Sequence, residues 1–396
     1  MTGVVMAPAV AGRSGEWTAD PGFGVYVHIP FCRHRCHYCD FNTYEGQDPI
    51  HGAYVDALVR AVERCAHATG HGPATSLFFG GGTPTLLAPA DLARILETVR
   101  GLVGIATDAE ITVEANPETV DEATFERLLD AGFNRVSIGV QSLAPHVLAG
   151  LGRTHSPEVA LTAIAAARRA GFGDINADLI YGSQWETGGD WLSSLDGIVS
   201  AGPDHISAYA LTIESGTPLA TLVSTGRLPD VDPDVQAERH AHACDVLGAA
   251  GYTRYEVSNW AQPGRASRHN VLYWCAGDYL GFGAGAHAHL GGRRSWSVRL
   301  PREFISRVAA GASVEAGSEV LHPDARAGEA LMLGLRLASG IDLDGFGARF
   351  GGAALAARRS AIDGLKGRGL LLEESGRLRI PGRHTLVANE VAAALL

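Results

Sequence analysis

The sequence predicts an α/β protein: a partial TIM-type barrel of six β/α units, followed by a small α+β domain of winged-helix type. Strand-like apolar runs alternate with helical patterns roughly every 30 to 35 residues, which indicates βαβ units and a parallel sheet. After about residue 320 the pattern changes to helices followed by a hairpin. A chain of 396 residues is long enough for both parts.

Strand-like runs of apolar residues precede residue 222. They are Val25–Ile29, Ser76–Phe79, Glu110–Glu114, Arg135–Val140, Asp174–Tyr181 and His205–Ile213. A complete TIM barrel needs eight strands, and the sequence after Ile213 does not supply two more clearly. We therefore expect an open barrel over residues 23–222.

The segments between these runs space their apolar residues as helices do. The predicted helices are Tyr54–Gly70, Asp91–Leu102, Asp121–Ala131, Ser156–Ala170 and Asp190–Ala201. Ser156 is a predicted N-cap because Pro157 follows it at the first helical position. Gly171 is the expected stop of the same helix.

The rest of the chain divides into three further parts. Residues 1–22 carry Gly, Ala, Pro and Ser without periodicity, which predicts a disordered N-terminal tail. Residues 223–320 are expected to extend the barrel. Residues 321–396 are expected to form the winged-helix-like domain. Its predicted elements are helices at Ala325–Leu337, Phe346–Arg358 and Ser360–Arg368, and a hairpin that turns at Ser375-Gly376.

Composition narrows the class of protein. A formal net charge of −11 argues against binding to nucleic acid. No apolar run reaches the roughly 20 residues that a transmembrane helix needs. Nothing at the N-terminus resembles a signal peptide, so we expect a cytoplasmic protein in a reducing compartment. Three scattered cysteines without a pairing pattern agree with this: Cys65, Cys244 and Cys275.

Three other cysteines lie in one short loop directly after the first strand. Cys32, Cys36 and Cys39 have the spacing C-x-x-x-C-x-x-C. Three thiolates on a four-iron cluster leave one iron free to bind a small molecule, so this spacing suggests a 4Fe-4S cluster. A zinc site completed by His34 or His37 is the alternative that remains open.

Chemically distinctive residues also follow the other predicted strands, and ligands of parallel sheets bind at the carboxyl ends of strands. The second strand runs into Gly80–Thr85, where missing side chains let a ligand approach the backbone. The third ends at Glu114. Asp178 lies among apolar residues of the fifth strand, so we expect a ligand or Arg153 beside it.

The cysteine loop resembles that of the radical SAM superfamily. This resemblance implies that the open iron chelates S-adenosylmethionine and that one-electron reduction cleaves it to a 5'-deoxyadenosyl radical, which requires an electron donor. The glycine run after the second strand is similar to the loop of that superfamily that holds the methionine amino group.

The strand-end motifs further resemble the coproporphyrinogen III dehydrogenase subfamily, which includes heme chaperones, over roughly residues 24–390. Matching motif by motif implies that Tyr26, Gly81 and Glu114 contact the cluster-bound S-adenosylmethionine, with Glu114 able to hold the ribose hydroxyls. A second S-adenosylmethionine site is implied for Gly82, Thr83, Gln141, Arg153 and Asp178.

Two features favour the heme chaperones within this subfamily. Phe41 stands where the dehydrogenase carries a fourth cysteine, and the N-terminal residues do not resemble the dehydrogenase's extension. The run from His269 to Trp274 is similar to the chaperones' H-N-x-x-Y-W motif. The resemblance implies binding of heme and its transfer to acceptor hemoproteins such as respiratory enzymes, without coproporphyrinogen dehydrogenase activity. The alternatives are a radical SAM enzyme acting on a tetrapyrrole and a radical SAM methyltransferase.

The heme ligand is left open by the residues. His269 and Tyr273 are candidates, because imidazole and phenolate both ligate heme iron. His287 and His289 compete with them. The other interpretation is that His269 and Asn270 cap a loop while the aromatic residues after them pack on the barrel.

Overall fold

The computed structural model describes residues 15–65 and 70–396. Six parallel strands form the centre of one large sheet, in the spatial order β1-β4-β5-β6-β7-β8. Their bounds are β1 Phe23–Ile29, β4 Ala74–Gly81, β5 Ile105–Ala115, β6 Arg135–Gln141, β7 Ile175–Tyr181 and β8 His205–Ala210. The predicted partial barrel of six β/α units is confirmed.

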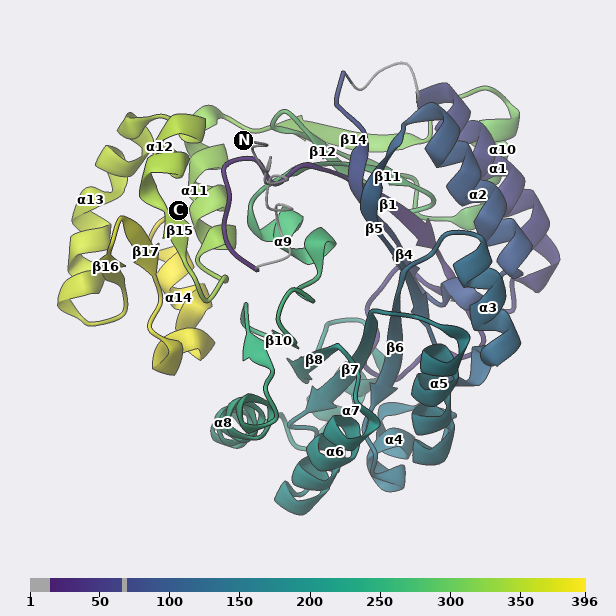
Figure 1. Cartoon of the computed structure of the whole chain (residues 1–396), viewed down its shortest axis with the longest axis horizontal. Helices are drawn as coiled ribbons and strands as arrows, with labels where there is room; N and C mark the ends of the chain where they lie inside the picture. The colour runs from purple at the N-terminus through teal and green to yellow at the C-terminus, as the bar shows by residue number, and fades with distance from the viewer. Residues whose placement is uncertain (1–14, 66–69) are drawn as a thin grey trace, which may run out of the picture.

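Helices cover the outer face of this curved sheet, each beside the next in chain order (Figure 1). They are α1 His51–Cys65, α2 Pro89–Leu102, α3 Glu122–Asp130, α5 Pro157–Ala170 and α6 Gly188–Ala201. The Ser156 hydroxyl accepts a hydrogen bond from the Val159 N–H, and Gly171 ends α5 at a φ of 112°. The predicted cap and stop of this helix are therefore confirmed. Residues 66–69, the end of the predicted Tyr54–Gly70 helix, lie outside the described residues.

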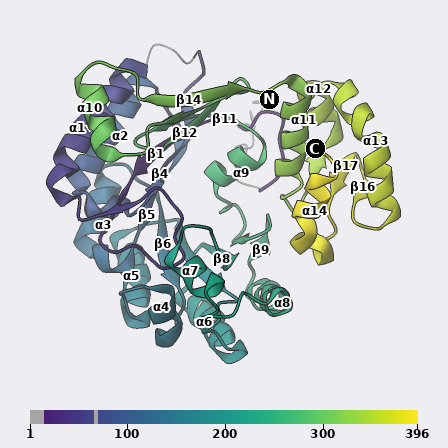
Figure 2. The same cartoon turned by 180° about the vertical axis from the view of Figure 1, so that it is seen from behind.

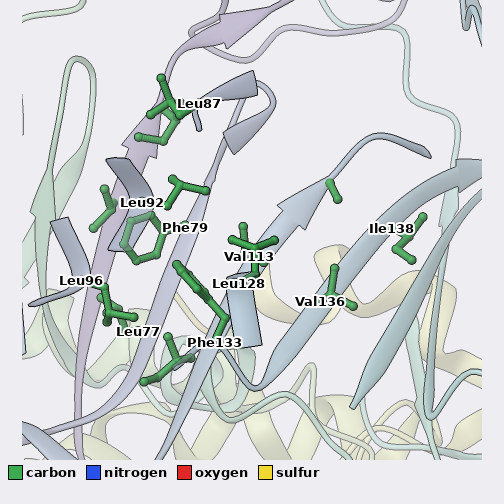
Figure 3. Close-up of a cluster of buried hydrophobic side chains, with 14 of the residues drawn as sticks. Leu77, Phe79, Leu87, Leu92, Leu96, Val113, Leu128, Phe133, Val136 and Ile138 are labelled. Atoms are coloured by element: carbon green, nitrogen blue, oxygen red, sulfur yellow. The ribbon is translucent and has the colours of Figure 1, made fainter. Parts of the chain in front are cut away.

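The core between sheet and helices is apolar and closely packed (Figure 3). Phe79 of β4 meets the Phe133 ring edge-on, with ring centroids 5.1 Å apart. Leu92 and Leu96 of α2 are fully buried in the same core. Each such side chain contributes roughly 1.5–3 kcal/mol of hydrophobic stabilisation, which holds the strand ends at fixed relative positions.

The sheet continues beyond both edges of the six-stranded centre. Beside β1 lie β11 Asp278–Phe282, β12 His287–Leu290, β13 Arg293–Ser297 and β14 Glu315–Val320. Beside β8 lie β10 Asn259–Ala261 and β9 Thr253–Arg254. Among these added strands, β11 pairs parallel to β1, and the others pair antiparallel to their neighbours. The sheet ends at β14 on one side and at β9 on the other, so the barrel is open.

Five further helices of different lengths lie between these parts of the described chain. They are α4 Pro145–Leu151, α7 Pro218–Ser224, α8 Pro233–Ala249, α9 Arg268–Trp274 and α10 Pro301–Ala309. Helix α9 packs against β1 and β4 on the concave side of the sheet, between the barrel and the C-terminal domain (Figures 1 and 2). No helix in the described part of the chain is long and apolar enough to cross a membrane.

The C-terminal domain combines helices with a small three-stranded sheet. Its elements are α11 Pro323–Gly334, β15 Ile341–Asp342, α12 Leu343–Phe350, α13 Gly352–Gly367, β16 Leu372–Glu374, β17 Arg377–Arg379 and α14 Ala388–Ala393. Ser375 and Gly376 form the predicted hairpin turn, both at positive φ, as a type I′ turn requires.

One predicted boundary in this domain is wrong. The sequence indicated a break between the second and third helices after Arg358, whereas the chain breaks at Gly351 and α13 runs through Arg358. Gly351 adopts a φ of 87°, which favours glycine. Arg358 does not end a helix. It is buried inside α13, and its guanidinium forms an ion pair with Asp324.

The prediction of a disordered tail over residues 1–22 is wrong for its described part, residues 15–22. Trp17 is 4% exposed and packs in the core of the C-terminal domain, with its ring centroid 6.3 Å from that of Phe346. A buried indole removes enough apolar surface from water to order the residues beside it. Residues 1–14 of the predicted tail lie outside the described residues.

Candidate cofactor-binding site

The three cysteines of the loop after β1 line one cavity of about 420 Å³ at the carboxyl ends of the strands. The Cys39 N–H donates to the Cys36 carbonyl at 3.2 Å, which folds the loop back on itself. Arg153 Nη1 lies 3.3 Å from Cys36 Sγ, and Thr83 Oγ1 lies 3.9 Å from Cys32 Sγ. All six cysteines of the chain are free thiols.

Burial keeps two of these thiols protonated in the protein alone. It raises the pKa of Cys32 to about 11 and also raises the pKa of Cys39. Bound iron would displace these protons, because a coordinating thiol is deprotonated by the metal's charge. Three convergent cysteines in one cavity therefore fit a cluster that the protein holds by three ligands.

The histidines beside the loop do not complete a closed zinc site. His37 Nδ1 lies 3.1 Å from the Gly150 carbonyl, and His34 Nδ1 lies 3.5 Å from a Glu45 carboxylate oxygen. In each ring, Nδ1 is thus engaged by a partner other than a metal. The donor set favours the iron–sulfur interpretation over the zinc alternative.

The glycine run after β4 passes close to the cysteine loop. A Cβ at Gly82 would lie 2.5 Å from the Phe31 carbonyl oxygen, so a side chain does not fit there. The N–H groups of Gly81, Gly82 and Thr83 donate to Glu114, Ile29 and Phe31, respectively. The loop therefore offers a ligand carbonyl oxygens, which are the acceptors that an amino group needs.

Glu114 lies at the end of β5 and faces the same cavity. Its Oε2 accepts the Gly81 N–H at 3.1 Å. Burial, together with the nearby charge of Asp178, raises the pKa of Glu114 to about 8. Near pH 7 the carboxyl is largely neutral in the protein alone, and it can both donate to and accept from a hydroxyl.

Arg153 joins the cysteine loop to two strand ends. Besides Cys36, it donates through Nη2 to the Asn116 side-chain oxygen at 3.0 Å and to the Gly139 carbonyl at 2.7 Å. Gln141 follows at a bulge of β6 and adopts a φ of 67°, a conformation that is uncommon outside glycine. Both side chains line the cavity.

Asp178 lines this cavity as well, and its carboxylate is held by two polar side chains. Its carboxylate accepts hydrogen bonds from Ser137 Oγ and Asn176 Nδ2, both at 2.8 Å, and it forms no hydrogen bond with Arg153. Burial raises its pKa. The expectation was a ligand or Arg153 near Asp178, and Arg153 does line the same cavity. The direct hydrogen-bond partners of the carboxylate are a serine and an asparagine on the same sheet face.

Tyr26 is the one predicted S-adenosylmethionine residue outside this cavity. It lines a neighbouring cavity, which shares Phe41, Gly81 and Glu114 with the first. Its hydroxyl lies 2.8 Å from His28 Nδ1. The other predicted residues converge on the cavity of the cysteines: Gly81, Gly82, Thr83, Glu114, Gln141, Arg153 and Asp178.

Helix α9 carries the H-N-x-x-Y-W run, and its N-terminus is capped by a distant carboxylate. Glu110 of β5 accepts the Arg268 N–H at 2.9 Å and the His269 N–H at 3.1 Å. His269 is 1% exposed; its Nδ1 lies 2.9 Å from Ser76 Oγ, and its Nε2 lies 2.8 Å from Tyr273 Oη. Burial lowers its pKa to about 3.

This geometry bears on the predicted heme ligands. Both ring nitrogens of His269 and the hydroxyl of Tyr273 are engaged, so either residue would have to break its hydrogen bonds to ligate iron. The ring of His269 also stacks on Phe78, at a centroid distance of 5.3 Å. In this conformation the motif fastens α9 to the barrel, as the packing interpretation expected.

Two residues that the sequence did not single out contribute to this region. Asn116 donates to Thr83 Oγ1 at 3.0 Å and accepts from Arg153, so it ties the glycine loop to the arginine. Its position two residues after Glu114 at a strand end was the available signal. Glu110 offered no such signal, because its partner helix lies 158 positions away.

Comparison with known proteins agrees with this arrangement. Residues 26–196 match the radical SAM superfamily, and residues 321–383 match the HemN C-terminal domain. The fold is similar to that of the coproporphyrinogen III oxidase HemN from Escherichia coli, with a TM-score of 0.81 and 22% identity over 98% of this chain and 92% of that one.

Relatives with higher identity carry another name. The heme chaperone HemW of Mycobacterium tuberculosis is 42% identical over 94% of this chain and 95% of its own length. HemW of Bacillus subtilis is 32% identical over 94% of this chain and 98% of its own length. A mitochondrial radical S-adenosyl methionine domain-containing protein 1 of Bos taurus is 40% identical over 78% of this chain and 67% of its own length. The chain belongs to the HemW family of the radical SAM superfamily.

Proposed function

We propose that this protein binds heme and transfers it to acceptor hemoproteins, such as respiratory enzymes. The observation that carries this proposal is the 42% identity to a named heme chaperone over 94% of the chain. Phe41 supports it, because this 64% exposed side chain occupies the position of the dehydrogenase's fourth cysteine and lines both cavities.

We further propose that Cys32, Cys36 and Cys39 hold a 4Fe-4S cluster and that Gly81 and Glu114 contact S-adenosylmethionine bound to it. Tyr26 would contact the same molecule from the neighbouring cavity. A reduced cluster supplies single-electron chemistry toward bound S-adenosylmethionine, so an external electron donor is a further partner. The residues proposed for a second S-adenosylmethionine are Gly82, Thr83, Gln141, Arg153 and Asp178.

The chain's own groups suit a regulatory role for this site. Arg153 links Cys36 to the ends of β5 and β6 through Asn116 and Gly139, so a change at the cluster loop reaches the strand ends through one guanidinium. Glu114 lines both cavities and connects the S-adenosylmethionine position to the larger cavity.

A cytoplasmic location is part of the proposal, supported by six free cysteines.

Heme transfer tests the proposal directly. The reconstituted protein is loaded with hemin and mixed anaerobically with a heme-depleted respiratory enzyme subunit, with and without S-adenosylmethionine and a reductant. We expect the acceptor to gain its heme spectrum and activity, and the rate to respond to S-adenosylmethionine. Cys39→Ser should abolish that response, whereas Cys65→Ser, which lies outside both cavities, should keep it.

Two outcomes would contradict this function. One is a wild-type protein that binds no hemin. The other is anaerobic turnover of coproporphyrinogen to protoporphyrinogen, which would assign the chain to the enzymes of the subfamily instead.

A further inference from the structure

The larger cavity beside the cluster site has the size and lining of a site for a planar aromatic ligand. Its volume is about 740 Å³, within the range of roughly 300–1,000 Å³ that is typical of ligand sites. Aromatic side chains line it from three parts of the chain: Tyr26, Phe41, Tyr273, Tyr279 and Trp296. Such walls suit the apolar faces of a porphyrin.

His287 is the histidine of this cavity whose ring nitrogens are available. It begins β12, is exposed, and lines the cavity with its ring stacked near Trp296 at a centroid distance of 5.9 Å. Within residues 15–65 and 70–396, no hydrogen bond engages its ring. Partial desolvation of the ring against the cavity wall, together with the positive charge of Arg294, lowers the pKa of His287. The imidazole is therefore neutral near pH 7 and keeps a lone pair for a metal.

The other histidines near the cavity are committed to partners. In His28, Nε2 donates to the Asn42 carbonyl at 3.0 Å, and Nδ1 therefore accepts from the Tyr26 hydroxyl. His269 is held at both nitrogens by Ser76 and Tyr273. His289 is buried, contacts the Gly277 carbonyl at 3.2 Å, and does not line the cavity.

A glycine on the neighbouring strand places His287. A Cβ at Gly281 of β11 would lie 1.8 Å from the His287 carbonyl oxygen, so only glycine lets the start of β12 lie this close. Gly285 lines the cavity in the turn between these strands, at a φ of 79°. The glycine-rich turn therefore has a structural reason, which is to bring His287 to the cavity wall.

The cavity rim also offers a cation. Arg299 is exposed and lines the cavity, and its Nε donates a long hydrogen bond of 3.4 Å to the Asn42 side-chain oxygen. No carboxylate among the described residues forms an ion pair with it. The terminal nitrogens of this guanidinium are placed to bind a carboxylate in the two-point geometry that arginine favours.

We propose that this cavity holds the heme cargo, with His287 as an axial ligand of the iron and Arg299 paired with a propionate. This assignment rests on the proposed heme chaperone function and names its site. One imidazole nitrogen replaces a water on the ferric iron, so no electron and no covalent attachment is needed. A single exchangeable ligand at an exposed strand end leaves the other axial position open to an acceptor.

Hemin titration of the full-length protein by absorbance tests the assignment. Wild type should bind one hemin with a histidine-ligated spectrum. His287→Ala should lose that spectrum and bind at least tenfold more weakly, and added imidazole should restore the spectrum because the rest of the cavity is intact. Arg299→Ala should weaken binding about tenfold without changing the ligand spectrum. The matched controls are His146→Ala and Arg302→Ala, which lie outside the cavity and should behave as wild type.

The outcomes separate this inference from the function on which it rests. If wild type binds no hemin, the proposed function fails. If wild type binds hemin and His287→Ala keeps both affinity and spectrum, the function stands and the site assignment is overturned. It is equally overturned if Tyr279→Phe or His269→Ala, but not His287→Ala, removes the ligand spectrum.

Discussion

Glu114 combines a proposed binding role with an unfavourable position for a charge. Its carboxyl is buried beside Asp178, and its pKa of about 8 lies well above the ordinary value of a glutamate. Between about pH 5 and 8 the folded protein keeps a proton that the unfolded chain has lost. The free energy of unfolding should therefore fall as pH rises through this window and level off above it.

This behaviour gives a prediction for the protein without its cofactors. Glu114→Gln removes the titration, so its stability relative to wild type should increase from pH 5 to pH 8, by an amount on the order of a few kcal/mol. Urea unfolding at both pH values measures the difference. Glu122→Gln, at a half-exposed ion pair with Arg169, is the control and should show no such trend. Parallel pH curves for Glu114→Gln and wild type would contradict the raised pKa.

Arg153 holds the cysteine loop through geometry that another cation cannot copy. Its planar guanidinium spans Cys36, Asn116 and Gly139, whereas a lysine ammonium is a point charge on a flexible chain. Arg153→Lys should therefore speed cluster loss to a chelator by about tenfold, the lower end for lost partners around metal ligands. Bleaching of the iron–sulfur absorbance measures this rate.

The control for this change is Arg169→Lys, at an exposed ion pair with Glu122. It should bleach at the wild-type rate. Equal rates for Arg153→Lys and wild type would mean that the contact between arginine and Cys36 does not support the cluster.

At the scale of elements, α9 is a short helix whose position depends on polar contacts. A helix of seven residues forms few internal hydrogen bonds. It therefore depends on Glu110, which accepts N–H groups at its N-terminus, and on the contact of its own His269 with Ser76 of β4. His269→Ala leaves the hydroxyls of Ser76 and Tyr273 without their buried partner and opens a gap beside Phe78. The cost should be about 2–4 kcal/mol in the free energy of unfolding.

Chemical denaturation measures this cost. His287→Ala, at an exposed strand end, should stay within about 0.5 kcal/mol of wild type. We thus expect His269→Ala to lower the free energy of unfolding and His287→Ala to weaken heme binding. A His269→Ala protein as stable as wild type would remove the packing interpretation of the motif.

At the scale of the whole molecule, the C-terminal domain shares a core with the barrel extension. Val271 and Cys275 of the α9 region are buried together with Leu331 and Phe346 of the domain. Arg349 adds hydrogen bonds to the carbonyls that follow α9. The domain is therefore fastened to the helix that is itself fastened to β4.

Trp17 adds a second attachment from the other end of the chain. Trp17→Ala should lower the free energy of unfolding by about 3–5 kcal/mol and make the C-terminal domain more sensitive to limited proteolysis. Glu16→Ala, an exposed neighbour, is the control. If the tryptophan variant resists protease as wild type does, the N-terminal segment does not stabilise the domain.

The sequence alone determined the parts of this protein that depend on local patterns. Strand and helix periodicity located the six parallel strands, and the spacing of Cys32, Cys36 and Cys39 located the cluster loop. The rule that ligands bind at the carboxyl ends of parallel strands brought Glu114 and Asp178 to the same cavity before any coordinates. These features can be predicted from the sequence because they depend on residues that are close together along the chain.

Only the tertiary structure decided which long-range partners these residues have. The sequence pattern suggested His269 as a heme ligand. In the structure its ring nitrogen contacts the hydroxyl of Ser76, 193 positions away, and no local pattern predicts such a contact. The short strand β11 carries Gly281, which weakens its strand signal, and β12 has only four residues. Pairing with β1 and β13 is what defines these strands. The availability of His287 emerges from that pairing, because burial and hydrogen bonding are properties of the packed chain.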